Sequence, residues 1–249
     1  MTRRNALVTV TLLAALAAAG RADQGPRAAR EGDELILQND ALRLTIDLKA
    51  GARVSQFVYR PFGENLVYPA ASSGGMLMDH VWEQTWPGEF LGRQYEGEVV
   101  EQAGPGEAAV RVWTTGCGET VKDVRLERRI ALRAGDRAVY VRVSLTNQAA
   151  EGRVTGYWIQ NNFWFDGAKT GVAWARPAVR GVDLMGVDEK GAAWFSNAWY
   201  YVDDATAGWN AAFHKARRQG VLFLMDYNDL WRIYDNAEAV TTEWMYDRV

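Results

Sequence analysis

The densest group of side chains that could do chemistry lies in the segment 79–89, which reads DHVWEQTWPGE. It places His80, one of only two histidines in the chain, among three carboxylates and two indoles: Asp79, Glu83, Glu89, Trp82 and Trp86. A histidine can supply a proton near neutral pH with an unshifted pKa, whereas a carboxyl group needs a raised pKa to do so. Indole faces suit the apolar faces of sugar rings. The segment predicts acid–base chemistry on a ligand, with His80 as the acid, Glu83 as one candidate base, and the other four residues as ligand contacts.

Two other interpretations of this segment stay open. In the first, Trp82 and Trp86 fill the core and His80 only bonds to a neighbouring strand. In the second, Asp79, His80 and Glu83 hold a hard cation such as calcium. A zinc centre of three histidines cannot be built because the chain has two histidines. We expect that the site holds no metal and no other cofactor.

A second polar cluster lies at 158–164, which reads WIQNNFW. Amide side chains carry hydrogen-bond donors and acceptors together, so Gln160 and Asn162 could grip neighbouring sugar hydroxyls. Two-residue alternation puts these two residues on one face of a strand. Trp158 and Trp164 flank them and predict aromatic walls. The competing interpretation is a turn at the end of a strand.

Several common enzyme classes lack their motifs here. The sequence has no Gly-rich phosphate loop, no Gly-x-Ser-x-Gly elbow and no His-Glu-x-x-His pair. Cys117 is the only cysteine, so the chain cannot form an internal disulfide, and a packing role is expected in preference to a nucleophilic one. Arg60, Arg93 and Arg125 could each bind a carboxylate through two N–H groups. Nothing in their spacing distinguishes them from ordinary surface charges.

The N-terminus has the layout of an export signal. Arg3 and Arg4 precede the uncharged apolar stretch 6–19, and small residues follow up to Ala22. We expect a signal peptide at 1–22, a periplasmic or extracellular mature protein, and no integral membrane segment after cleavage. Paired arginines occur in signals of both the general and the twin-arginine route, so the export route stays open.

The charge balance argues against a nucleic-acid partner. The chain carries 28 Lys and Arg against 31 Asp and Glu, a net charge of −3. Cleavage after Ala22 would remove three arginines and leave 25 basic residues, for a net charge of −6. This sign excludes capture of anionic polymers by the whole surface, but it allows a local basic pocket.

The rest of the chain reads as strands. Residues 23–33 are polar, Arg-rich and without periodicity, which predicts a flexible lead, with order beginning near Glu34. Two-residue alternation then recurs, for example over 42–48, and 124–146 predicts a long hairpin that turns at Ala134-Gly135-Asp136-Arg137. No window shows a helical apolar period. The expectation is one all-β domain over 34–249, a large antiparallel β-sandwich.

This layout resembles the galactose mutarotase-like superfamily, which includes the aldose 1-epimerases. The resemblance rests on three stretches in order: Gln38 to Ile46, Gly51 to Phe57, and Gly63-Glu64-Asn65-Leu66-Val67. The strand that ends Val143-Ser144-Leu145-Thr146-Asn147 is similar to the central strands of the family. The resemblance implies a β-supersandwich that handles sugars.

The sequence departs from the family pattern at two places. The epimerases carry a catalytic histidine soon after the Leu-Thr-Asn element, whereas 157–164 contains none. The family base is a glutamate on a late strand, and by order Glu243 is the residue to which the resemblance assigns this role. The sequence stops at Val249 directly after a strand-like run, so a missing closing strand is one alternative to a full supersandwich.

Two functions follow from these observations. The first is an exported carbohydrate-active protein that transfers protons at a sugar ring, as an epimerase, lyase or hydrolase would, with His80 as acid and Glu243 or Glu83 as base. The second is a non-catalytic saccharide-binding protein, which the many tryptophans and the absent family histidine favour. The sequence does not decide between enzyme and binding protein, and it leaves the saccharide and the oligomeric state open.

Overall fold

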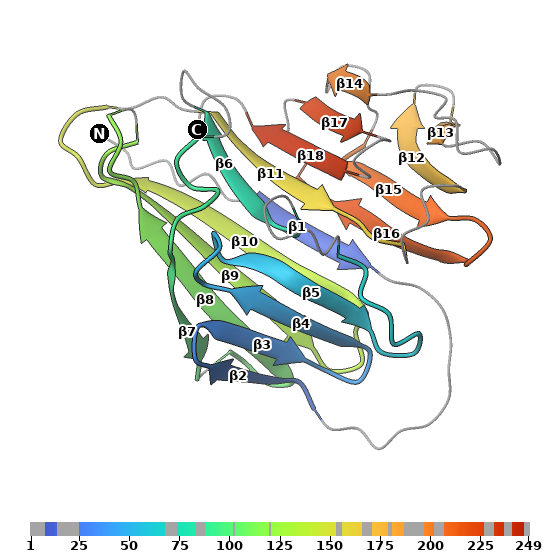
Figure 1. Ribbon diagram of the computed structural model, residues 1–249, viewed down its shortest axis with the longest axis horizontal. Coiled ribbons are helices and arrows are strands. Elements are labelled where there is room, and N and C mark those ends of the chain that lie inside the picture. The colour runs from blue at the N-terminus through green and yellow to red at the C-terminus, as the bar shows by residue number, and fades with distance from the viewer. Residues whose placement is uncertain are drawn as a thin grey trace.

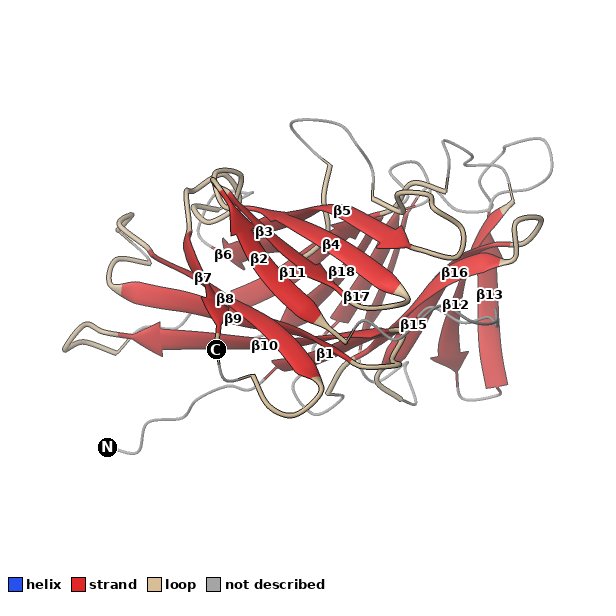
Figure 2. Ribbon diagram, turned by 90° about the horizontal axis from the view of Figure 1, so that it is seen from below, coloured by secondary structure: helices blue, strands red, loops and turns tan. Residues whose placement is uncertain are grey.

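The structure of the protein, a computed structural model, is built from antiparallel strands. It describes residues 8–13, 25–67, 74–82, 88–101, 103–119, 121–152, 156–165, 171–178, 181–186, 197–201, 207–226, 232–236 and 241–246. Figure 2 shows strands and loops throughout these residues. They contain no helix that is long and apolar enough to cross a membrane. The all-β class predicted by two-residue alternation is confirmed.

The largest layer is a nine-stranded sheet in which every pairing is antiparallel. Its order is β13 (Gly181–Gly186), β12 (Val172–Ala178), β15 (Trp209–His214), β16 (Gln219–Leu224), β1 (Val8–Leu13), β10 (Ala138–Asn147), β9 (Val124–Arg133), β8 (Glu107–Thr115) and β7 (Glu96–Val100). The hairpin predicted over 124–146 is confirmed as β9 and β10.

Two smaller sheets lie on one side of the large sheet (Figures 1 and 2). The four-stranded sheet has the order β2 (Arg27–Glu31), β3 (Glu34–Gln38), β4 (Leu42–Asp47) and β5 (Arg53–Tyr59). The five-stranded sheet has the order β14 (Asn197–Tyr201), β17 (Arg232–Asn236), β18 (Thr241–Tyr246), β11 (Gly156–Asn162) and β6 (Met78–Trp82). The molecule is therefore a sandwich whose second layer is divided into two sheets.

The core lies between these layers, and all three sheets contribute to it. Leu35 and Leu44 of the four-stranded sheet, Val81 and Ile159 of the five-stranded sheet, and Ile130 of β9 are all buried in one apolar cluster. The alternation seen in the sequence produces this core, because successive side chains of a strand point to opposite faces and only one face is apolar. Burial of these side chains is the main force that holds the layers together.

The N-terminal region differs from the expectation in where order begins. Arg27–Glu31 forms β2 and pairs with β3 along its full length, so ordered backbone starts before Glu34, inside the predicted flexible lead. β2 is an edge strand with mostly exposed side chains, and such a strand needs no apolar alternation. Val8–Leu13, within the predicted signal peptide, forms β1 between β10 and β16. Cleavage after Ala22 would remove this strand from the large sheet.

Candidate functional site

The pairing of β6 with β11 brings the two predicted clusters together. These strands are antiparallel neighbours, with His80 opposite Trp158 and Met78 opposite Gln160. On the other face of the same strands, Val81 and Ile159 are fully buried in the core, which fixes the register, because a shift by one residue would turn that apolar face outward. The register therefore places His80, Trp158 and Gln160 on the face of the five-stranded sheet that points away from the large sheet.

A chain of hydrogen bonds runs along this face. The His80 Nε2 lies 2.8 Å from the Gln160 Oε1, and the Gln160 amide donates to the Asn162 Oδ1 at 3.0 Å. An amide oxygen only accepts, so the His80 Nε2 must carry a hydrogen and donate it to Gln160. His80 thus fixes the orientation of the Gln160 amide.

Burial assigns different roles to the members of this chain. The His80 ring is fully buried and stacks on the Trp158 indole, with 4.9 Å between ring centroids and 12° between planes. Trp158 is itself 4% exposed, and Asn162 is also buried. Gln160 is half-buried and is the member that a ligand can reach. His80 and Trp158 were predicted to face a ligand directly, whereas in the structure their side chains are buried beside Gln160.

The next strand brings the predicted base into register with Gln160. Glu243 of β18 is the Cα partner of Gln160, and the same row continues to Tyr234 of β17 and Trp199 of β14. The structure describes the backbone of these three strands and not their side chains. Cross-strand partners share one face of a sheet. Glu243 and Gln160, which are 83 residues apart in sequence, therefore occupy neighbouring positions.

Sequence reasoning missed other residues that the register brings to this face. The row that starts at His80 and Trp158 continues through Met245 to Arg232 and Tyr201. In the sequence, the segments that hold these residues look like short strands rich in aromatic residues and next to turns. The available signal was the two-residue spacing of Arg232, Tyr234 and Asn236, which puts these three residues on one face of a strand.

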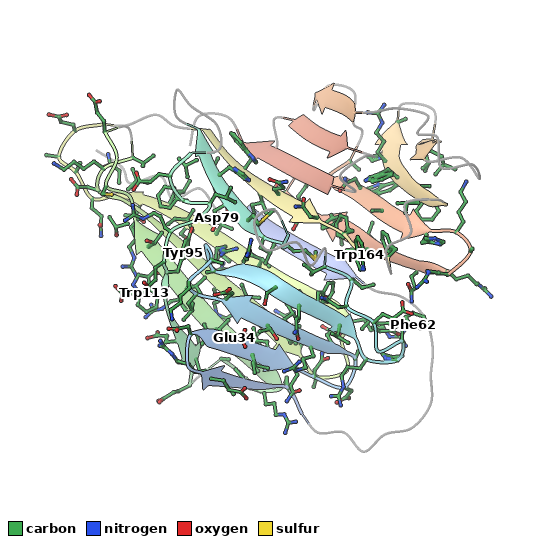
Figure 3. All side chains as sticks on the ribbon, viewed as in Figure 1. Glu34, Phe62, Asp79, Tyr95, Trp113 and Trp164 are labelled. Carbon is green, nitrogen blue, oxygen red and sulfur yellow. The ribbon has the colours of Figure 1, made fainter. Side chains whose placement is uncertain are left out.

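Asp79, predicted as a ligand contact, lies on the opposite side of β6 from His80. Its carboxylate accepts hydrogen bonds from the Tyr95 hydroxyl at 2.8 Å and the Tyr157 hydroxyl at 2.6 Å, and its side chain is fully buried. Figure 3 shows Asp79 and Tyr95 next to each other in the interior. The structure therefore places Asp79 in the core, where it anchors β6 and is out of reach of a ligand on the His80 face.

Arg128 of β9 is the cation of this buried group. Its Nη2 lies 3.2 Å from the Asp79 Oδ2 and donates to the carbonyls of Ala52 and Gly51 at 2.7 and 3.1 Å, and its Nη1 donates to the Leu77 carbonyl. The guanidinium and the carboxylate are both fully buried. One side chain of the large sheet thus binds the β4–β5 turn of the four-stranded sheet and the start of β6.

The two tyrosines of this group predict a loss of stability at high pH. Burial raises the pKa of Tyr95 and of Tyr157 well above 10, the nearby Asp79 charge raises it further, and Arg128 opposes the effect. A phenol whose pKa is higher in the folded state stabilises the fold below its unfolded pKa of about 10, and this contribution is lost as the pH rises above that value. Each tyrosine should lower the free energy of unfolding by up to about 1.4 kcal/mol per pH unit.

Urea unfolding between pH 9 and 11 measures this slope. Tyr95→Phe is expected to reduce the slope by close to one proton. Tyr140→Phe is the comparison, because the pKa of Tyr140 is also raised, mainly by its hydrogen bond to Asp136, but its hydroxyl lies near the surface and its effect should be smaller. Equal slopes in the wild type and Tyr95→Phe would contradict the prediction.

Glu89, another predicted ligand contact, has its own partners in the structure. Its Oε1 accepts from the Cys117 amide at 2.7 Å, its Oε2 accepts from the Gly118 amide at 2.6 Å, and Arg93 forms an ion pair with it. Burial opposes ionisation, but these amides and the Arg93 charge outweigh it and hold the pKa of Glu89 below its usual value. Glu89 therefore stabilises the loop at 116–118 through its backbone amides. No hydrogen bond in the described part of the chain joins Glu89 to His80.

The remaining predicted contacts are only partly placed. Trp164 is half-buried just beyond β11, where its amide donates to the Leu66 carbonyl. Trp82 ends β6 opposite Gly156, but its side chain is not described. Glu83 and Trp86 lie outside the described residues. Across the described ranges, no three His, Cys, Asp or Glu side chains come together as metal ligands would.

Comparisons with known proteins give the same architecture. No protein-family model matches the sequence, and no curated protein matches it either. A candidate aldose 1-epimerase from Klebsiella pneumoniae superposes with a TM-score of 0.62 at 13% identity, over 89% of this chain and 73% of that one. A galactose mutarotase-like protein from Clostridium acetobutylicum gives 0.57 at 10% identity, over 90% and 88%.

A third solved structure is much longer. A TPR-domain containing protein from Parabacteroides distasonis gives a TM-score of 0.51 at 10% identity over 86% of this chain, and this chain spans 47% of its length. Identities this low establish the fold and nothing finer. The chain has the β-sandwich fold of the galactose mutarotase-like proteins.

Proposed function

We propose that the protein binds a saccharide on the outward face of the five-stranded sheet and carries out acid–base chemistry on its ring. The observation that carries the proposal is the row in which Gln160 and Glu243 are direct cross-strand partners. An amide and a carboxylate at this spacing can bind neighbouring hydroxyls and accept a proton from one of them. The fold shared with galactose mutarotase-like proteins supports a sugar as the ligand.

Each residue of this face has a separate role in the proposed reaction. Glu243 acts as the base, and Gln160 orients the sugar through its amide. His80 is a positioning residue, because its Nε2–H holds the Gln160 oxygen and its buried ring has no exposed surface. Arg232, Tyr234 and Trp199 supply further contacts from their register positions on the same face.

The second candidate function is saccharide binding without turnover. The same geometry favours it in one respect: His80, the acid predicted from the sequence, is fully buried and already donates to Gln160. A protein that lacked an exposed acid at this face would bind sugars without exchanging their protons.

Titration calorimetry with a panel of neutral mono- and oligosaccharides tests the shared part of both functions. Gln160→Ala is expected to weaken binding of the best ligand about tenfold or more, because buried polar contacts to a sugar lose their partner. Gln56→Ala, which removes an exposed amide from the four-stranded sheet, should leave the affinity within about twofold. If both variants bind like the wild type, the proposed face is wrong. Proton exchange at the bound sugar, followed by NMR, then separates enzyme from binding protein.

We further propose that the protein works outside the cytoplasm after removal of residues 1–22. The charged start, apolar stretch and small residues at the predicted cleavage point support this. Mass spectrometry of the protein recovered from the exporting cell would give a chain that begins at Asp23 if the proposal is right. A recovered chain that retains Val8–Leu13 would contradict the proposal, because β1 would then stay in the large sheet.

A further inference from the structure

Three arginines lie side by side across the outer face of the large sheet. Arg111 of β8 is the Cα partner of Arg129 of β9, and Arg129 is the Cα partner of Arg142 of β10. Their neighbours in sequence, such as Val112, Ile130 and Val141, are buried in the core, so the arginines occupy the outward positions. Like charges placed directly opposite each other in a sheet repel and destabilise it. This row therefore stands out on a chain whose net charge is −3.

Carboxylates neutralise only part of the row. Arg111 forms ion pairs with Glu98 at 2.6 Å and with Glu127 at 3.9 Å, and Arg129 forms one with Glu107 at 2.5 Å. Arg142 is exposed and makes no hydrogen bond or ion pair with any described residue. Its guanidinium, with five N–H donors, is thus available at the end of the row.

The surface is hollowed at this place. A groove of about 470 Å³ is lined by Glu98, Val100, Arg111, Glu127, Arg129, Arg142 and Ser144. Ser144 lies two residues after Arg142 on the same face, so its hydroxyl can add a hydrogen bond to a group held by Arg142. The groove therefore combines one guanidinium without a described partner, that of Arg142, with space for a small group.

An aromatic side chain lies next to the groove. Trp113 is half-exposed two residues after Arg111 on β8 (labelled in Figure 3), and the guanidinium groups of Arg111 and Arg125 each lie 5.2 Å from its ring centroid. An indole offers an apolar platform for the C–H face of a sugar ring, while arginine forks bind carboxylate or sulfate oxygens.

We propose that this groove binds the acidic group of an acidic saccharide, with Arg142 and Arg129 on the oxyanion and Trp113 beside the sugar ring. The site lies on the outer face of β8, β9 and β10 and shares no residue with the Gln160 face. The proposal rests on the proposed function only in taking the ligand to be a saccharide. Binding of the oxyanion itself follows from the arginine row alone.

Calorimetry at low ionic strength tests the groove with three probes: an oligogalacturonate, a neutral maltooligosaccharide of equal length, and inorganic sulfate. Arg142→Gln is the test variant, since Arg142 has no described partner and its loss should not disturb the fold. Lys122→Gln is the matched control, because Lys122 is also exposed and without a described partner but lies outside the groove. Thermal unfolding of both variants should match the wild type.

We expect the wild type to bind oligogalacturonate, sulfate to compete for this binding, and Arg142→Gln to weaken it about tenfold or more. Lys122→Gln should stay within about twofold. Equal weakening by both variants would contradict the proposal, because the binding would then depend on the charge of the whole surface and not on the groove. The absence of any binding of oligogalacturonate or sulfate would also contradict it. Loss of maltooligosaccharide binding in Gln160→Ala would report on the site at the Gln160 face and not on the groove. The proposed function and the proposed groove can therefore be contradicted independently of each other.

Discussion

Replacing Arg128 by methionine is expected to lower the free energy of unfolding by about 3–5 kcal/mol, because it leaves the buried Asp79 carboxylate without its cation. The same change removes the donors to the carbonyls of Leu77, Gly51 and Ala52. Each buried carbonyl that loses its partner adds to the cost. Urea unfolding followed by tryptophan fluorescence measures the difference.

Two further variants separate the buried charge from general effects of losing an arginine. Arg142→Met on the adjacent strand removes an exposed arginine without a described partner, and we expect a change within about 0.5 kcal/mol. Adding Asp79→Leu to Arg128→Met should recover part of the lost stability, because the unpaired charge is then removed as well. A loss below about 1 kcal/mol in Arg128→Met would show that the ion pair contributes little.

Glu243→Gln is expected to lower the turnover of a converted sugar by about 10²–10⁴-fold, the range typical of a removed general base. Glutamine keeps the size and hydrogen-bonding reach of glutamate but cannot accept a proton in the same way. Affinity for the sugar should change little, because Gln160 and the aromatic residues of the face are untouched. Single-turnover kinetics and calorimetry on the same preparation separate the two effects.

Glu34→Gln serves as the control for the Glu243 experiment. Glu34 is exposed at the start of β3, on the four-stranded sheet (Figure 3), and should tolerate the same change without effect. Turnover that survives in Glu243→Gln would exclude Glu243 as the base. Binding without any turnover in the wild type would leave the saccharide-binding function.

Much of the fold could be predicted from the sequence because alternation reports directly on burial. Leu42, Leu44 and Ile46 are buried, as their spacing indicated, and the hairpin of β9 and β10 turns where the glycine-containing segment predicted. β2 was not predicted because an edge strand exposes most of its side chains and carries no apolar period. Two-residue apolar alternation predicts a strand only where one face of that strand is buried.

The candidate site was harder to predict because strand pairing is not written in local sequence. His80 and Gln160 were each singled out, but their contact depends on the pairing of β6 with β11, which are separated by more than 70 residues. Asp79 was predicted to contact a ligand beside His80. Its burial depends on Arg128 and Tyr157, which come from distant strands. Adjacent residues of a strand point to opposite faces, so one sequence cluster was divided between the core and the ligand face.

The charged character of β2 also bears on how copies of the protein behave in solution. An open sheet edge can add a strand from another molecule and so begin aggregation, and charged side chains along the edge suppress this. β2 forms the free edge of the four-stranded sheet and carries Arg27, Arg30 and Glu31, while β7 forms the nearby edge of the large sheet and carries Glu96 and Glu98. We therefore expect the charged side chains on this side of the sandwich to disfavour addition of a strand from another molecule.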